Sequence, residues 1–333
     1  MTSGLTRERT AKADKPYGLA AALVTGSLVV FGTLAWFLPA LLGKSPYSDH
    51  PVVIPDAIKH PPAIWFFNFG IPVVATVVFI ALTVQSVRRK SLSWYWLFFV
   101  SGVASFWVET IADWSIYLTY SPAFATYQLP FNYPWHVWDN PAFIPFAYGV
   151  YWGVFPYVVL RINQFVSKRF GWGGLKSLLI VGIPFSYCWD LLVEGTATYF
   201  GWWTYEPPLG PHFSWVPLGG AGIQTLIVPP LLMIIWPNVV AWMAGDPKDG
   251  TSPRIARLFR IPAHRDLSGI GTASLHELAT PTRSSWDVRY ELLKIGGWIS
   301  VFYWAQVTQL LPVVLVRYVF GHESVFAPFP NWL

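Results

Sequence analysis

The chain is organised around the stretch Ser186-Tyr-Cys-Trp-Asp190-Leu-Leu-Val-Glu194-Gly-Thr-Ala-Thr-Tyr-Phe-Gly201-Trp-Trp-Thr-Tyr-Glu206-Pro. It places two carboxylates four residues apart in an apolar segment that ends in a glycine and an aromatic cluster. Four residues is slightly more than one helical turn, so Asp190 and Glu194 share one helix face, about 6 Å apart along the axis. The stretch therefore predicts an apolar helix with an acidic pair on one side.

A weaker echo of this pattern lies upstream, in Trp107-Val-Glu109-Thr-Ile-Ala-Asp113-Trp-Ser-Ile-Tyr117-Leu-Thr-Tyr120. Glu109 and Asp113 are again four residues apart and are again followed by aromatic residues. The echo is too weak to predict an internal repeat. We expect both acidic pairs to lie in membrane helices, at similar depth, and to face one shared cavity.

The composition is typical of a helical membrane protein. Of the 333 residues, 54% are hydrophobic and only 12% are charged, whereas a soluble domain carries about a quarter charged residues. Trp and Tyr, which favour the membrane–water interface, are abundant, with 20 Trp in the chain. We therefore expect an all-α, polytopic integral membrane bundle. The net charge of +5 comes from short basic clusters between apolar runs, which indicates topology signals and no nucleic-acid partner.

Seven segments are apolar and long enough to cross the bilayer, which requires about 20 residues per helix. They are 18–42, 64–87, 92–118, 142–163, 175–200, 217–243 and 292–318. The first of them is too long for a signal peptide and lacks a clear cleavage site, so we expect it to be retained as a membrane helix.

Basic residues alternate between the connections. They gather in the second, fourth and sixth connections and do not occur in the third and fifth, at 119–141 and 201–216. The positive-inside rule then places the N-terminus in the cytoplasm and the C-terminus outside. The expected organisation is a cytoplasmic tail at 1–17, six helices with two aromatic outer loops at 18–243, a basic cytoplasmic loop at 244–291, and a seventh helix with an external tail at 292–333.

The acidic residues inside these helices are the candidate catalytic groups, namely Glu109, Asp113, Asp190 and Glu194. Charged residues inside a membrane are costly, face the bundle interior or water, and are usually functional. Like charges this close cannot all ionise cheaply, so at least one carboxyl should hold a proton near neutral pH. A protonated acid beside a carboxylate is suited to general acid–base chemistry. The alternative is a structural network bonded to Thr, Tyr and Trp side chains.

Further polar and aromatic residues map to the same outer half of the bundle and are candidate substrate-binding residues. They are Asn68, Tyr117, Tyr151, Trp202, Trp203, Tyr205, Gln224 and Gln306. Each polar group alone could instead make a helix–helix hydrogen bond, and the aromatic residues could form an interfacial belt. The sharper interpretation is a polar pocket in an apolar wall, covered by an aromatic lid.

Metal and nucleotide chemistry fit the sequence poorly. The loop histidines His136 and His212 lack the close pairing that metal sites commonly use, and the single cysteine, Cys188, excludes a multi-cysteine site. The sequence has no glycine-rich phosphate loop and no dinucleotide fingerprint. We therefore expect neither a metal nor a cofactor.

The segment that follows Ser186 resembles the avermectin-type spirocyclase (AveC-like) family of actinobacterial membrane proteins. The resemblance is carried by Asp190-Leu-Leu-Val-Glu194-Gly, by Gly201-Trp-Trp-Thr-Tyr205 and by the proline-rich stretch to Trp215. The upstream acidic residues, with Tyr117-Leu-Thr-Tyr120-Ser-Pro, are similar to the family's second acidic-aromatic block. The family carries an Asp-Pro in that block, so either Glu109 or Asp113 could be the equivalent carboxylate.

The resemblance implies dehydrative cyclisation of a dihydroxy-ketone polyketide, or a similar hydrophobic or lipid-like molecule, to a spiroketal. A protonated carboxyl would activate the ketone, and one hydroxyl would add to give a hemiketal. Loss of water would leave an oxocarbenium ion, which the second hydroxyl traps. We expect Glu194 to be the acid and Asp190 its partner, with Glu109 or Asp113 as hydroxyl base or cation stabiliser.

Two other functions would use the same residues. An isoprenoid or carotenoid cyclase, or a hydratase, also needs an intramembrane acid and aromatic walls. A proton-coupled lipid transporter, or an accessory membrane protein, would use the carboxylates as a relay. Transporters often have inverted repeats, and the sequence shows no convincing one.

Overall fold

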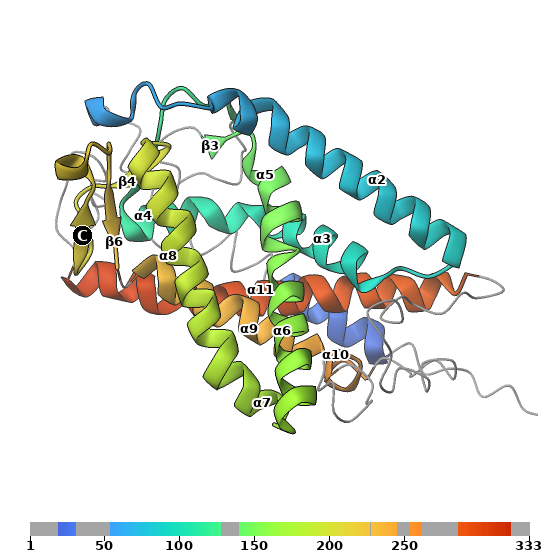
Figure 1. The fold of residues 1–333 in the computed structure, drawn as a ribbon. Coiled ribbons are helices and arrows are strands. Elements are labelled where there is room, and N and C mark those ends of the chain that lie inside the picture. The colour runs from blue at the N-terminus through green and yellow to red at the C-terminus, as the bar shows by residue number, and fades with distance from the viewer. Residues whose placement is uncertain are drawn as a thin grey trace, which may run out of the picture.

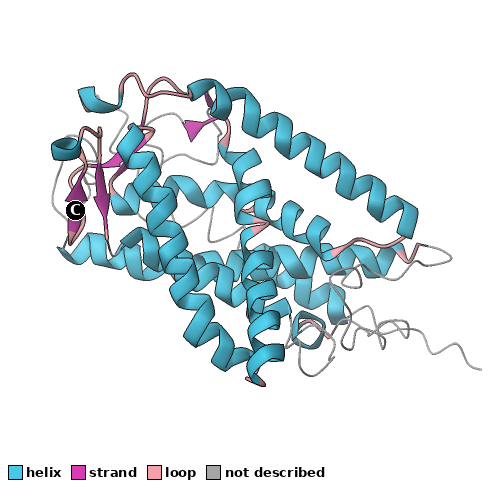
Figure 2. Cartoon of the chain, viewed as in Figure 1, coloured by secondary structure: helices cyan, strands magenta, loops and turns pink. Residues whose placement is uncertain are grey.

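The computed structural model describes residues 19–30, 54–127, 140–226, 228–244, 254–260 and 286–320. These parts are mostly helical (Figure 1, Figure 2), as expected for a helical bundle. The longer helices are α2 (Ile71–Arg89), α3 (Trp94–Ala104), α4 (Glu109–Ile116), α6 (Phe155–Phe170), α8 (Ile183–Phe200), α9 (Val228–Ala244) and α11 (Val288–Phe320). The shorter ones are the N-terminal Leu19–Val30 helix, α5 (Ile144–Ala147), α7 (Gly174–Ser177) and α10 (Arg254–Leu258).

Short segments of tighter or wider helix interrupt or extend these elements. The 3₁₀ turns are η2 (Asp56–Ile58), η4 (Phe106–Val108) and η8 (Val216–Leu218). The π-helical segments are η3 (Phe66–Gly70), η6 (Tyr148–Trp152) and η7 (Leu178–Gly182). π-helical segments are rare and occur frequently at functional sites, which draws attention to η6 and its aromatic residues.

Within the described residues, six short strands pair as three antiparallel ladders that were not predicted from the sequence. They are β1 (Leu118–Tyr120) with β4 (Trp203–Tyr205), β2 (Thr126–Tyr127) with β3 (Asn140–Pro141), and β5 (His212–Ser214) with β6 (Ile223–Thr225). Tyr117 (φ 57°) follows α4 and Gly201 (φ 71°) follows α8. A left-handed residue after a helix turns the chain out of the helical path. The outer loops at 119–141 and 201–216 therefore begin as paired strands.

Two predicted helices are corrected by the structure. The helix expected at 92–118 is broken at Ser105, whose hydroxyl donates to the Ser101 carbonyl oxygen at 2.8 Å, and such a bond often bends a helix. The helix expected at 217–243 begins only at Val228, because Pro217 and Gly219 (φ 80°) close the turn between β5 and β6.

The other predicted segments agree more closely where they are described. Continuous helix covers Phe66–Arg89 and Gly174–Phe200, close to the predicted 64–87 and 175–200. The helix expected at 142–163 is divided into α5, η6 and α6 by a turn at 153–154 and ends only at Phe170, and α11 begins inside the predicted loop at 244–291. The tail at 1–17, most of 18–42, most of 244–291 and residues 321–333 lie outside the described residues.

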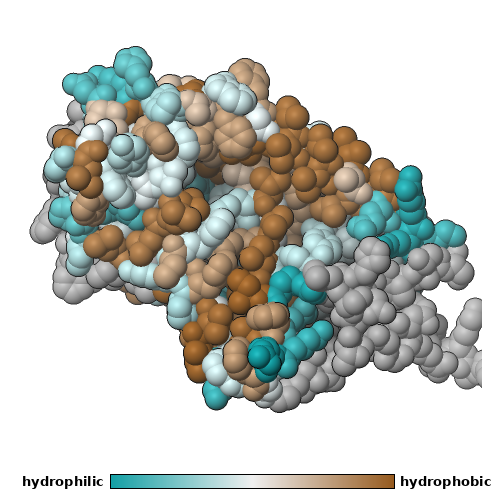
Figure 3. All heavy atoms as spheres, viewed as in Figure 1, coloured by the Kyte–Doolittle hydropathy of each residue, from teal (hydrophilic) through white to brown (hydrophobic). Residues whose placement is uncertain are grey.

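Two helices of the described chain, Phe66–Arg89 and Gly174–Phe200, are long and apolar enough to cross a membrane. Shorter apolar helices occur at Leu19–Val30, Trp94–Val108 and Leu232–Ala244. Apolar side chains cover the outside of α2, where Val73 and Val77 are 60% and 61% exposed, and Figure 3 shows this hydrophobic band. These surfaces hint at membrane association, and the seven-helix topology stays a prediction.

The core gathers around α9, which packs against α6, α8 and α11 (Figure 1). Trp236 of α9 and Phe302 of α11 are fully buried and meet edge to face, with ring centroids 5.4 Å apart. Between α9 and α8, the Asn238 amide donates to the Ser186 hydroxyl at 3.0 Å. This packing fixes the face of α8 that carries the acidic pair.

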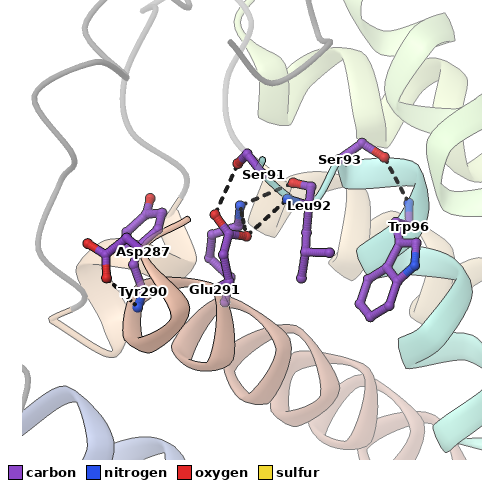
Figure 4. Close-up of polar contacts among 8 residues, drawn as sticks. Ser91, Leu92, Ser93, Trp96, Asp287, Tyr290 and Glu291 are labelled. Carbon is purple, nitrogen blue, oxygen red and sulfur yellow. Dashed lines mark hydrogen bonds and ion pairs between the residues drawn. The ribbon is translucent and has the colours of Figure 1, made fainter. Parts of the chain in front are cut away.

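A buried polar cluster joins the α2–α3 turn to the start of α11 (Figure 4). The Glu291 carboxylate accepts from the Ser91 hydroxyl at 3.0 Å and from the Leu92 backbone N–H at 3.1 Å. It also pairs with Lys294 at 2.8 Å, and the Lys294 ammonium donates to the Leu92 carbonyl oxygen. The cluster therefore anchors one end of α2, a helix whose outer surface packs against little else.

Close packing at Gly102 sets the position of η6 against α3. A Cβ atom at Gly102 would lie 2.2 Å from the Tyr148 carbonyl oxygen and 3.0 Å from the Gly153 nitrogen. Only glycine allows this approach of two backbones. The contact holds Tyr148 next to the start of α4, where the first acidic pair begins.

Candidate active site: a carboxyl cluster in an apolar cavity

A cavity of about 220 Å³ lies between α4, α8, η6, α11 and the β1–β4 ladder. All four candidate acids line it, which confirms the expectation that the two acidic pairs face one shared cavity. The remaining wall is largely aromatic and aliphatic, with the tyrosines and tryptophans concentrated near the acids. The other lining residues include Phe67, Ile71, Tyr120, Phe143, Ile144, Tyr148, Tyr151, Trp152, Trp203, Tyr205, Leu232, Met233, Gln306 and Gln309.

Glu109 lies in the first turn of α4 and accepts two tyrosine hydrogen bonds. The Tyr120 hydroxyl of β1 donates to Oε1 at 2.6 Å, and the Tyr148 hydroxyl of η6 donates to Oε2 at 2.6 Å. Hydrogen bonds to an ionised acceptor are short and roughly twice as strong as neutral ones. The two tyrosines therefore stabilise the carboxylate form of Glu109 against the cost of its burial.

Glu194 of α8 has a similar environment. The Trp203 indole N–H donates to Oε2 at 2.8 Å, and the Tyr205 hydroxyl donates to the same oxygen at 2.5 Å. Both donors come from β4. An indole N–H can only donate, so this contact requires an acceptor at Glu194 and favours the carboxylate form.

The two aspartates differ from the glutamates in having no such donors. Asp113 and Asp190 are each 3% exposed, and neither Oδ2 atom has a hydrogen-bond partner among the described residues. A buried charge without partners is costly, whereas a protonated carboxyl needs less compensation and can itself donate. The cavity thus combines two carboxylates that accept hydrogen bonds with two carboxyl groups suited to carrying a proton.

The two glutamates belong to units with the same internal spacing. Each accepts from a tyrosine eleven residues later, and each tyrosine follows a threonine of the ladder centre, Thr119 or Thr204. Two backbone hydrogen bonds at the ends of the ladder follow the same symmetry. The Ser121 N–H donates to the Trp202 carbonyl oxygen and the Glu206 N–H donates to the Tyr117 carbonyl oxygen, both at 3.0 Å. The two acidic segments are therefore related by a local two-fold symmetry, which is clearer in the structure than in the sequence.

Half of the predicted substrate-binding residues line the cavity, namely Tyr151, Trp203, Tyr205 and Gln306. Trp203 and Tyr205 also hold Glu194, as described above. The Tyr151 hydroxyl accepts from the Trp189 indole at 3.1 Å. Gln306 is 1% exposed and bonds to Gln309 on the next turn of α11.

The other half is placed elsewhere and has structural contacts. The Asn68 side chain accepts from the Ala125 N–H at 3.0 Å, and the Gln224 amide donates to the Leu191 carbonyl oxygen at 3.1 Å. The Trp202 indole donates to the Pro62 carbonyl oxygen at 2.8 Å. Tyr117 is buried at the left-handed turn after α4. Asn68 and Gln224 were predicted from their depth along the helices, and Trp202 and Tyr117 from the aromatic stretches after the acidic pairs, and neither signal tells which way a side chain faces.

Several cavity residues were not among the predicted site residues. Tyr120 and Tyr148 hold Glu109, and Gln309, Trp152 and Met233 complete the wall. A signal for Tyr120 was present in the sequence, because a Thr-Tyr pair follows both glutamates at the same distance. Tyr148, like Tyr151, begins the predicted fourth helix at the depth of the acids, but its pairing with Glu109 had no signal in the sequence, since the close α3–η6 contact sets its position.

The polar groups outside the cavity add no further chemistry to the site. Partial burial raises the pKa of Glu206, which follows the Tyr205 of the cavity wall but does not line the cavity within the described structure. His212 is exposed and contacts the Gly210 carbonyl oxygen, and His136 lies outside the described residues. Among the residues that the structure describes, no group of three or more His, Cys, Asp or Glu is arranged to hold a metal ion.

Comparison with known proteins does not assign the chain to a family. No family model, no curated protein and no solved structure matches it. Function therefore has to be argued from the cavity itself, and the resemblance to AveC-like proteins stays a prediction from the quoted residues.

Proposed function

We propose that this protein is an integral membrane enzyme that catalyses an acid-dependent dehydrative cyclisation, closing a dihydroxy-ketone polyketide or a lipid-like substrate to a spiroketal. One observation carries the proposal: one apolar cavity holds two hydrogen-bonded glutamates and two aspartates whose Oδ2 atoms have no hydrogen-bond partner among the described residues. Neighbouring carboxyl groups in different environments are the usual basis for acid and base roles in one site.

The hydrogen bonds favour aspartate as the acid and glutamate as the base. Asp190 donates its proton to the ketone oxygen as one substrate hydroxyl adds to the carbonyl carbon and gives its proton to Glu194. A proton returned through the cluster then converts the hemiketal hydroxyl to water, which leaves. The second hydroxyl adds to the resulting oxocarbenium ion and gives its proton to a glutamate, so that one water is lost overall. This assignment exchanges the roles expected for Asp190 and Glu194 from the sequence.

The cavity wall suits the cationic intermediate. Trp152 and Trp203 line the cavity beside the acids, and an aromatic face attracts a cation. Burial also keeps bulk water from trapping the oxocarbenium ion before the second hydroxyl reaches it. Glu109, held by two tyrosines, supplies a second negative charge within the same cavity and can receive the second hydroxyl proton.

The proposal includes the membrane topology. Seven helices in a bacterial plasma membrane, with the N-terminus in the cytoplasm and the C-terminus outside, would place the cavity in the outer half of the bilayer. The support comes from the alternation of basic clusters in the sequence, from the two long apolar helices and from the exposed apolar surface of α2. A hydrophobic substrate could then reach the cavity from the bilayer.

A second candidate is a proton-coupled lipid carrier, and the paired glutamate–tyrosine units favour it. Repeated units around a shared axis are common in transporters. Here the relationship covers only the two short units joined by the β1–β4 ladder, which is much less than a repeated bundle of helices. We therefore place the carrier second, and a product that differs from its precursor by one water would separate it from the cyclase.

Mass spectrometry of lipid extracts tests the proposal. Cells with the wild type, Asp190→Asn, Glu194→Gln or no protein are compared, with Glu206→Gln as a matched carboxyl-to-amide change outside the cavity. We expect a precursor one water heavier than the product to accumulate equally in both cavity variants and in the null strain, whereas Glu206→Gln matches the wild type. If the cavity variants match the wild type while the null strain differs, the carboxyls are structural and the enzyme proposal is wrong.

A further inference from the structure

The cavity contains a pair of glutamine amides whose hydrogen bonds are incomplete. Gln306 and Gln309 lie one turn apart on α11, are 1% and 4% exposed, and line the cavity. The Gln309 amide nitrogen donates to the Gln306 carbonyl oxygen. The Gln306 amide nitrogen and the Gln309 carbonyl oxygen have no partner in the part of the chain that the structure describes.

This outcome does not depend on how the two amides are turned. The nitrogen and oxygen of an amide side chain are assigned from the hydrogen-bond network. If both amides were reversed, Gln306 would donate to Gln309, and the free carbonyl and the free N–H would exchange places. In either orientation the pair presents one donor and one acceptor side by side.

Leaving these groups unpaired is expensive. A buried donor or acceptor without a partner is destabilising, and two apolar side chains at these positions would avoid that cost. The two groups line the same cavity as the acids, so a bound molecule can complete their hydrogen bonds.

We propose that the Gln306–Gln309 amide pair is the docking point for a β-hydroxy ketone group on a neutral substrate. The substrate carbonyl accepts from the free amide N–H, and its neighbouring hydroxyl donates to the free amide carbonyl. The inference rests on the proposed function, which requires a neutral substrate that carries both hydroxyl and ketone groups. It extends that function by assigning substrate recognition to α11, apart from the carboxyl groups on α4 and α8.

The charge and chemistry of the cavity argue against carboxylate, ammonium and pure hydrocarbon ligands at the amide pair. A carboxylate ligand would face the negative cluster of Glu109 and Glu194, and an ammonium ligand offers no acceptor to the free amide N–H. A pure hydrocarbon, as in an isoprenoid, satisfies neither amide group. The amide pair therefore argues against the isoprenoid alternative and for an oxygenated substrate.

Binding measurements on the purified protein in lipid nanodiscs test this inference without any need for turnover. The probes are an aliphatic β-hydroxy ketone of medium chain length, the matched ketone without the hydroxyl, and the matched alcohol without the ketone. Calorimetric titration should show the hydroxy ketone binding about tenfold more tightly than either matched probe, as two neutral hydrogen bonds allow.

The double variant Gln306→Leu/Gln309→Leu removes both amides and should abolish this preference. It should unfold at the same temperature as the wild type or higher, because replacing both polar partners with apolar groups is nearly neutral or stabilising. Thr308→Val is the matched control, since Thr308 is exposed on the same helix turn and bonds only back to the Trp304 carbonyl oxygen among the described contacts. It should keep the preference for the hydroxy ketone.

Two outcomes would overturn the inference, and neither depends on the reaction. One is equal binding of all three probes by the wild type, and the other is an unchanged preference in a folded double variant. The mass-spectrometric test above can succeed in either case, because it reports on the carboxyls. Conversely, a clear probe preference with unchanged products in Asp190→Asn and Glu194→Gln would leave the docking point standing and remove the cyclase.

Discussion

Thr119 and Thr204 pair directly at the centre of the β1–β4 ladder, and each precedes the tyrosine that holds the glutamate of its own helix. The ladder therefore joins two distant parts of the chain and sets both carboxylates at once. Strand register is strict, because a slip of one residue turns every side chain to the opposite face. A small strand pair in a loop thus fixes the geometry of a site whose acids lie on helices.

The tyrosines of the ladder should matter for activity more than for folding. Tyr120→Phe and Tyr205→Phe each remove one donor from a buried carboxylate while keeping the ring. A hydrogen bond to a charged group contributes about 1.5–3 kcal/mol, so we expect product formation in cells to fall at least about tenfold in each variant. The yield of protein purified in detergent should stay near the wild-type level.

Tyr187→Phe is the control for this pair. The Tyr187 hydroxyl also makes one hydrogen bond, to the Leu226 carbonyl oxygen at 2.9 Å, but the residue does not line the cavity in the described structure. It should leave the product level unchanged. Wild-type product levels in both ladder variants would show that the tyrosines do not assist catalysis.

Gly102 should tolerate no side chain. In Gly102→Ala the new Cβ atom would lie 2.2 Å from the Tyr148 carbonyl oxygen, and backbone cannot easily move there. Overpacking of this kind typically costs about 1–3 kcal/mol. We expect a lower midpoint of thermal unfolding in detergent, together with loss of product, because displaced η6 backbone carries Tyr148 away from Glu109.

Gly26→Ala provides the comparison. Gly26 lies in the Leu19–Val30 helix, and a Cβ atom there would meet nothing within 4 Å. Alanine also has the higher helix propensity. This variant should unfold at the wild-type temperature or slightly above it, and a loss as large as that of Gly102→Ala would point to a general intolerance of substitution.

The acidic residues of the site could be predicted from the sequence because a carboxylate in an apolar run is informative without any knowledge of its neighbours. Asp190 and Glu194 share a helix face by spacing alone, and the upstream pair follows the same rule. Their meeting in one cavity followed from similar depths along two helices. The helical class was predictable for the same reason, since apolar runs of this length are visible directly.

The rest of the site could not be predicted, because it depends on contacts that spacing does not encode. Strands of three residues have too few positions to show an alternating pattern, so β1 and β4 remained hidden in aromatic loops. Asn68 and Gln224 were expected at the same depth as the acids. In the structure, η3 and β6 direct their side chains to Ala125 and Leu191 instead. The position of a residue along a predicted helix indicates its height in the bundle but does not indicate the direction of its side chain.

The Glu291–Lys294 cluster that anchors α2 should contribute to stability mainly through its charges. Lys294→Met leaves the nearly buried Glu291 carboxylate without its cation, and removing one partner of a buried pair costs about 3–5 kcal/mol. We expect a clear drop in the thermal unfolding midpoint. Glu291→Gln/Lys294→Met removes both charges but keeps an acceptor for the Leu92 N–H, so it should be less harmful than Lys294→Met alone.

The exposed pair Asp56–Lys59 is the matched case for this test. Both side chains are well exposed, at 94% and 45%, and Lys59 holds the pKa of Asp56 below its usual range. Surface pairs of this kind contribute little to stability. Asp56→Asn should therefore leave the unfolding midpoint unchanged, and equal effects of Asp56→Asn and Lys294→Met would mean that the α11 cluster does not anchor α2.

Cysteine labelling in intact cells tests the topology. Cys188, the only cysteine of the chain, lies exposed on the outer surface of α8, so a bilayer around α8 should shield it from a charged, membrane-impermeant maleimide until detergent is added. In a Cys188→Ser background, His212→Cys should label from outside the cell. Arg88→Cys, at the exposed end of α2, should label only after the membrane is opened. Labelling of both positions from outside would contradict the predicted topology, because its three crossings at 92–118, 142–163 and 175–200 place residues 88 and 212 on opposite sides of the membrane.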